Sequence, residues 1–104
     1  MLRVALIMVG VLMVGCGSPQ QDLDTLCKEA GVALAKKELS ADQRRVHVAA
    51  AVDGKVKSSG LKTAFSAVAS APKEQKYQLM QRAAEEEGVP GWKCPDLKAV
   101  FDGK

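Results

Sequence analysis

Three cysteines, one histidine and a run of three glutamates are the residues whose chemistry requires an explanation in this chain of 104 residues. Nucleophilic catalysis needs a base beside a serine, threonine or cysteine, and a zinc site needs several ligands. The lone histidine, His47, lies between Arg45 and Val48 with no partner motif, and no Gly-x-Ser-x-Gly, P-loop or His-Glu-x-x-His sequence occurs. We therefore expect no enzyme activity and no metal or cofactor, and we expect His47 at the surface or the edge of the core.

The first cysteine, Cys16, ends a segment typical of an export signal. Residues 4–14 form an apolar run behind Arg3, too short for a transmembrane helix, which needs about 20 residues. The run ends in Gly15-Cys16, and this end resembles the lipobox of bacterial lipoproteins, in which a small residue precedes an invariant cysteine. Met13 departs from the leucine that is usual there.

The resemblance to lipoproteins implies a cleaved signal peptide over residues 1–15 and an acylated Cys16 inserted in the lipid bilayer. Each buried methylene adds about 0.8 kcal/mol, so several acyl chains anchor a protein firmly. Gly17 resembles the default outer-membrane signal, which implies the cell envelope, at the periplasmic face of the outer membrane. Residues 16–21 are then expected to form a lipidated tether, and residues 22–104 one folded domain.

The other two cysteines, Cys27 and Cys94, are expected to form one disulfide. An exported domain with an even number of cysteines favours such a bond, and no Cys-x-x-Cys sequence suggests redox work. The bond would close a loop of about 67 residues, which chain entropy makes worth about 4 kcal/mol. That is a large contribution for so small a domain, so the expected role is structural.

Apolar spacing predicts an all-α fold, a compact bundle of four helices plus a short C-terminal helix, stapled by the disulfide. The expected domain is rich in alanine and lacks isoleucine, which favours helix over strand. The helices are expected to begin or break at a capping box at Ser40, at residues 58–60, at Pro72, at Gly88 and at Pro95. Their apolar stripes are Leu23, Leu26, Cys27, Ala30 and Leu34; Leu61, Ala64, Phe65, Val68 and Ala69; Tyr77, Met80 and Ala84 with Leu79 and Ala83; and Leu97, Val100 and Phe101.

The second helix has the least certain pattern. Its expected core face comprises Val46, Ala49, Ala50 and Val56, with Val52 as a further candidate. A strand over residues 46–52 stays open as an alternative.

Charge is unevenly distributed along the chain. Residues 36–62 are basic within a formal net charge of +3, so they could meet anionic headgroups, lipopolysaccharide phosphates or an acidic protein, or be an ordinary solvated surface. Few aromatic residues are available for stacking on bases, and we expect no nucleic-acid partner. Glu85, Glu86 and Glu87 do not converge on one ion when helical. They indicate a solvated helix end or pairing elsewhere.

These features favour a non-enzymatic binding or assembly module for a protein partner in the envelope. The architecture is similar to that of pilotins, small helical lipoproteins that escort secretin subunits, although no pilotin site can be carried over. A groove lined by Leu61, Phe65, Tyr77 and Met80 could hold a partner helix, and Trp92 either packs over the disulfide or anchors a partner. The alternatives are a structural envelope protein that contacts peptidoglycan or lipopolysaccharide, and an enzyme inhibitor.

Overall fold

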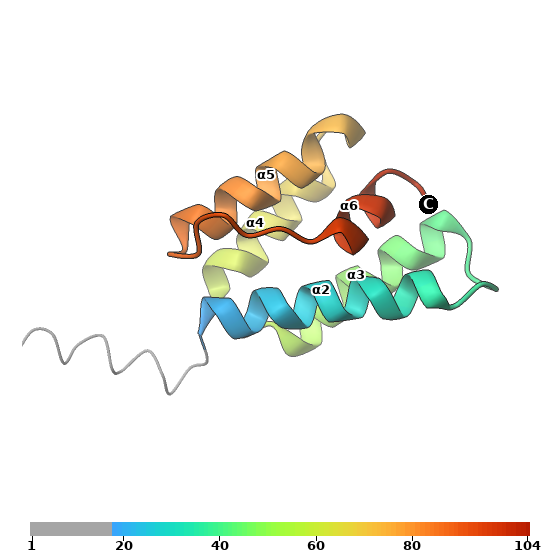
Figure 1. The fold of residues 1–104 in the computed structure, drawn as a ribbon, viewed down its shortest axis with the longest axis horizontal. Coiled ribbons are helices and arrows are strands. Elements are labelled where there is room, and N and C mark those ends of the chain that lie inside the picture. The colour runs from blue at the N-terminus through green and yellow to red at the C-terminus, as the bar shows by residue number, and fades with distance from the viewer. Residues whose placement is uncertain (1–17) are drawn as a thin grey trace, which may run out of the picture.

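The computed structural model of the chain describes residues 18–104. Figure 1 shows two antiparallel helical hairpins and a short last helix packed between them. Within the described residues there are five helices and no strand, which confirms the all-α bundle and excludes the strand over residues 46–52. The helices are α2 (Pro19–Ala35), α3 (Ala41–Lys55), α4 (Ser59–Ala69), α5 (Lys73–Glu86) and α6 (Pro95–Phe101).

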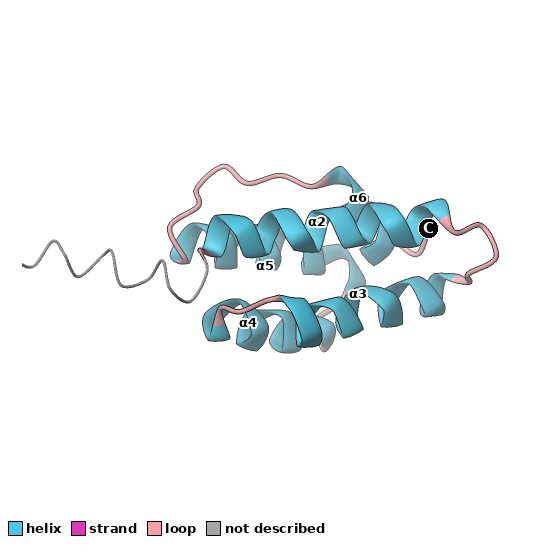
Figure 2. Cartoon of the chain, turned by 90° about the horizontal axis from the view of Figure 1, so that it is seen from below, coloured by secondary structure: helices cyan, strands magenta, loops and turns pink. Residues whose placement is uncertain are grey.

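The hairpins are arranged in two layers. Figure 2 shows α2, α5 and α6 in one layer and α3 with α4 in the other. Each hairpin spans both layers, because α2 packs on α3 and α4 packs on α5. The helix α6 contacts α2, α3 and α5, and so links the hairpins near the C-terminus.

Two serine capping boxes start the first hairpin. Ser40 Oγ accepts the Gln43 N–H at 3.2 Å, and Gln43 Oε1 accepts the Ser40 N–H at 2.8 Å, as the sequence predicted. Ser18 and Gln21 form the same box, with Pro19 in the first turn. The expected tether over residues 16–21 is therefore wrong for its last three residues, because this cap starts α2 at Pro19 rather than at residue 22.

The core lies where α2, α5 and α6 meet. Leu23, Met80 and Leu97 have no exposed surface. The predicted Cys27–Cys94 disulfide is confirmed, with the Cα atoms 5.7 Å apart. Cys94 is also the N-cap of α6, since its Sγ accepts the Leu97 N–H at 3.3 Å. The bond thus joins the centre of α2 to the segment that leads from α5 into α6.

The predicted core face of α3 is wrong. Val46 is 66% exposed, and Ala49 and Ala50 are exposed too. The helix instead buries Val48, Ala51 and Val52, a face rotated by two residues, or about 200°. The physical reason is that three polar side chains of α3, Arg44, His47 and Lys55, reach back to α2 through hydrogen bonds. Polarity along α3 therefore does not mark the solvent side. Val56, which caps α3, is buried as predicted.

A buried carboxylate connects the start of α2 to the loop between α3 and α4. Asp22 is 4% exposed, and its two oxygens accept the N–H groups of Lys57 at 3.1 Å and Ser58 at 2.7 Å. Backbone donors compensate the desolvation of a carboxylate. Ser58 is in turn the N-cap of α4, so one acidic residue fixes the position at which the second hairpin starts.

Candidate functional site

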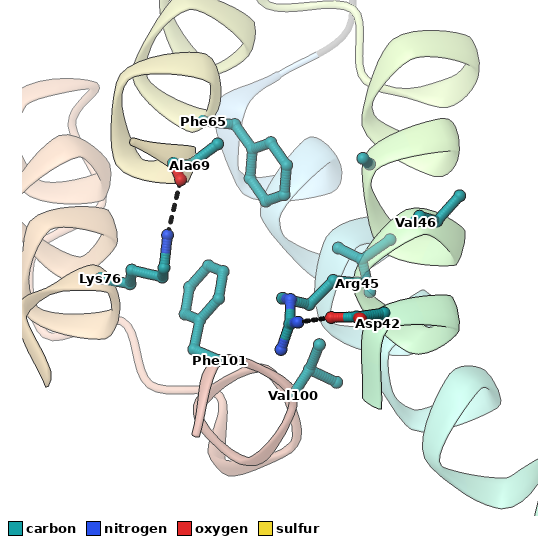
Figure 3. A pocket seen from close by; sticks show the side chains of 10 residues that line it. Asp42, Arg45, Val46, Phe65, Ala69, Lys76, Val100 and Phe101 are labelled. Atoms are coloured by element: carbon teal, nitrogen blue, oxygen red, sulfur yellow. Dashed lines mark hydrogen bonds and ion pairs between the residues drawn. The ribbon is translucent and has the colours of Figure 1, made fainter. Parts of the chain in front are cut away.

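An apolar hollow of about 360 Å³ lies between α3, α4 and α6. Phe65 of α4 and Phe101 of α6 lie side by side in it, with ring centroids 6.2 Å apart (Figure 3). Val48 and Val100 form its other apolar walls. The hollow is of the size at which proteins bind small ligands or the side chains of a partner.

Short side chains keep this hollow open. Ala49 on α3 and Ala69 on α4 face each other across it and are both exposed, because neither side chain is long enough to close the gap. Val46 stands at the rim, and among the described residues it is the one large hydrophobic side chain that is exposed. An exposed valine beside an unfilled apolar hollow is unfavourable in isolation, and such a combination marks an interaction site.

Charged side chains border the hollow on two sides (Figure 3). Arg45 forms an ion pair with Asp42, one turn earlier in α3. Lys76 of α5 donates from Nζ to the carbonyl oxygens of Val68 at 3.1 Å and Ala69 at 2.7 Å. A cation on the last carbonyls of a helix is favourable because these oxygens have no partner within the helix. Lys76 therefore fixes the end of α4 against α5.

The residues predicted to line one groove lie in separate places. Phe65 lines the hollow, whereas Met80 and Leu61 are 0% and 3% exposed and belong to the core. Tyr77 and Trp92 pack on each other, with ring centroids 6.4 Å apart. The predicted groove is therefore wrong as a set.

Trp92 belongs to the core, which favours packing over the predicted role as a partner anchor. Its side chain is 8% exposed and its carbonyl accepts a hydrogen bond from Gln81 Nε2 at 3.1 Å. Tyr77 Oη accepts the Cys94 N–H at 2.6 Å, next to the disulfide. These contacts hold the segment between α5 and α6 against the bundle.

Sequence reasoning missed the α3 and α6 walls of the hollow. Val46 and Ala49 had been assigned to the core, and Phe101 had been assigned to the core alone. The phase of α3 was the signal that could have found them. A helix whose polar residues are committed to a neighbour must expose some apolar ones.

A polar cluster lies at the other face of α3. Glu29 of α2 is 8% exposed, and its carboxylate oxygens contact Lys55 Nζ at 2.8 Å and His47 Nε2 at 2.9 Å. The hydrogen bonds from Lys55 and then His47 lower the pKa of Glu29, outweighing its partial burial. His47 thus lies at the edge of the core, as predicted, and it joins two helices through this contact.

The basic segment over residues 36–62 is partly used inside the fold. Arg44 donates from Nε to the Ala33 carbonyl at 3.1 Å and from Nη2 to the Lys36 carbonyl at 3.1 Å, and so caps the end of α2. Lys55 is bound to Glu29. Two of its cations therefore have a structural role.

The glutamate run also has an internal contact. Ser58 Oγ donates to Glu87 Oε1 at 3.4 Å, which places this carboxylate at the N-terminus of α4. Its carboxylate occupies the position that a Cβ on Gly60 would take. Anionic groups at a helix N-terminus are favourable, and Gly60 provides the space. Glu85 and Glu86 are exposed.

Cys16 and the signal segment lie outside the described residues. Within residues 18–104, no three histidine, cysteine or acidic side chains are grouped so that they could hold a metal ion. No helix in this range has the length and apolarity needed to cross a membrane. Comparisons with protein-family models, curated proteins and solved structures found no match to this chain.

Proposed function

We propose that the chain is a lipid-anchored, non-enzymatic module of the bacterial cell envelope that binds a protein partner at the apolar hollow. One observation carries the proposal: the hollow remains open beside an exposed Val46, although the rest of the bundle is well packed. The position of the hollow supports it. Figure 1 shows that α2 starts at the opposite end of the bundle from α6 and the start of α3, which form the hollow.

This arrangement suits an anchored binding module. An acyl group on Cys16 would hold the chain by the end where α2 starts. The helix α2 has 17 residues and spans about 25 Å, so the hollow would lie at the far end from the bilayer. The one histidine is bound to Glu29, which supports a role without acid–base catalysis.

The anchor and the binding site are tested separately. Mass spectrometry of the chain from bacterial membranes should show an acylated Cys16 at the N-terminus, and Cys16→Ser should release the protein from the membrane. An unmodified N-terminus that still starts at Met1 would contradict the anchor.

The binding site is tested with a photo-crosslinking residue at Val46 and a matched one at Glu86, which is exposed on α5. Crosslinking in intact cells should give a defined protein adduct from position 46 alone, and Ala49→Glu should abolish it. Equal adducts from both positions would contradict a site at the hollow. Adducts with lipopolysaccharide or peptidoglycan from position 46 would instead support the structural envelope role.

A further inference from the structure

The hollow continues as a trough along the α3–α4 pair. A second hollow of about 290 Å³ lies beside the first, and the two share Ala49, Phe65 and Ala69 as walls. Phe65 therefore stands between two depressions that follow one line. We call this surface the α3/α4 trough. It comprises Asp42, Arg45, Val46, Ala49, Val52 and Asp53 on α3, Lys62, Phe65, Ser66 and Ala69 on α4, and the contributions of α5 and α6 to the first hollow.

The dimensions of the trough match those of a short helix. Its α3 wall runs from Asp42 to Asp53, and eleven residues of helix rise about 16 Å, or three turns. The small side chains of Ala49, Ser66 and Ala69 are exposed, so another backbone can approach closely. Helices pack with their axes 8–10 Å apart when the contact residues are small or interdigitate.

The two walls of the trough differ in charge. The α3 wall has Asp42, Arg45 and Asp53, which sum to −1, whereas the opposite wall has Lys62 on α4 and Lys76 on α5. A ligand complementary to both walls has an apolar face with cations along one flank and carboxylates along the other. An amphipathic helix meets that description, because its two flanks are independent.

Other occupants fit the trough less well. A second copy of the chain would need two long apolar side chains to fill the two hollows, and within residues 18–104 only Val46 is large, apolar and exposed. An acyl chain suits the first hollow, but Asp53, Lys62 and Ser66 make the second one polar.

We propose that the α3/α4 trough binds an amphipathic helix of about three turns from a partner protein. Apolar side chains of this helix enter the two hollows on either side of Phe65, its acidic flank faces Lys62 and Lys76, and its basic flank faces the α3 wall. The inference rests on the proposed function and specifies the partner segment.

A selection experiment tests the inference without knowledge of the partner. A random library of 14-residue helical peptides is selected on the full chain in lipid nanodiscs, with Ala49→Glu as the variant for counter-selection. Ala50→Glu is the matched control, because Ala50 is exposed on the same helix and lines neither hollow. Circular dichroism verifies that both variants fold.

The expected peptides have apolar residues at i, i+3, i+4 and i+7, with carboxylates on one flank and cations on the other. Ala49→Glu should weaken their binding at least tenfold, and Ala50→Glu less than twofold. Selection on Lys62→Glu should replace carboxylates by cations on the flank that faces α4.

Three outcomes would overturn the helical occupant. They are peptides that bind Ala49→Glu as well as the parent chain, selected peptides without helical apolar spacing, and a dimer of the parent chain that Ala49→Glu dissociates. If crosslinking from Val46 still captures a protein and loses it in Ala49→Glu, the proposed function stands while the helical occupant fails. Loss of both results would remove both proposals.

Discussion

Reduction of the Cys27–Cys94 bond is expected to lower the free energy of unfolding by about 4 kcal/mol. The bond joins residues 67 positions apart, which encloses most of the described bundle in one covalent loop. Closing a loop of that length removes about 15 cal/mol/K from the entropy of the unfolded chain, which is worth about 4.4 kcal/mol at 25 °C. Domains of this size have total stabilities of about 5–15 kcal/mol, so the bond is expected to supply a large part of the total.

The same difference sets the expected change in melting temperature. A loss of 1 kcal/mol lowers the melting temperature of a domain of 60–100 residues by about 4–8 °C. Reduction should therefore lower it by about 16–32 °C. A reducing agent removes no side-chain atom, so this measurement leaves out the cavity that a cysteine substitution creates at the fully buried Cys94.

The assay is urea unfolding of the oxidised and reduced chain, followed by circular dichroism and by the fluorescence of Trp92, the sole tryptophan. The double variant Cys27→Ser/Cys94→Ser serves as the control and should unfold at or below the urea midpoint of the reduced chain. A loss below about 1 kcal/mol on reduction would refute the loop argument. It would mean that contacts such as the hydrogen bond from Cys94 N–H to Tyr77 Oη, at 2.6 Å, hold the segment without the bond.

Three further predictions concern single side chains. Glu29→Gln should lower stability at pH 7 by about 1–2 kcal/mol; because the pKa of Glu29 is lowered in the fold, the loss should be complete above its ordinary value of 4.5 and should disappear as the pH falls through the folded pKa, so urea midpoints that differ equally at pH 3 and pH 7 would contradict it. Gly60→Ala should change stability by less than about 0.5 kcal/mol alone, because helix propensity gains what the displaced Glu87 loses, but should stabilise a Glu87→Ala background by about 1 kcal/mol; an additive double-mutant cycle would count against that contact. Ser40→Ala should cost about 1 kcal/mol in thermal unfolding through loss of the α3 cap, and an unchanged midpoint would argue against the capping box.

Local signals in the sequence were sufficient for the helices and the disulfide. The capping box at Ser40, the break before Leu61 and the stop at Gly88 each depend on neighbouring residues, and all three lie at helix ends in the structure. Gly88 has a φ of +93°, a conformation that favours glycine. The cysteine pair was predictable because only two cysteines remained after the lipobox residue.

The face of α3 depended on tertiary contacts and could not be predicted in this way. Apolar periodicity assigns polar residues to solvent, but His47 and Lys55 turn towards Glu29, eighteen or more residues away in the chain. This commitment rotates Val46 out of the core. The hollow follows from the same rotation, so its location depended on an ion cluster whose partners belong to different helices.

The hydrogen bonds of Asp22 affect how the bundle would bear a mechanical load. A force applied to the chain ahead of Ser18 enters the bundle through the first turn of α2. There Asp22 passes part of it to the backbone of Lys57 and Ser58, at the junction of the two hairpins. Further along α2 the Cys27–Cys94 bond passes the remainder to α6. Tension at that end would therefore load both hairpins in parallel instead of peeling α2 away one turn at a time, which suits a domain that is held by its N-terminus.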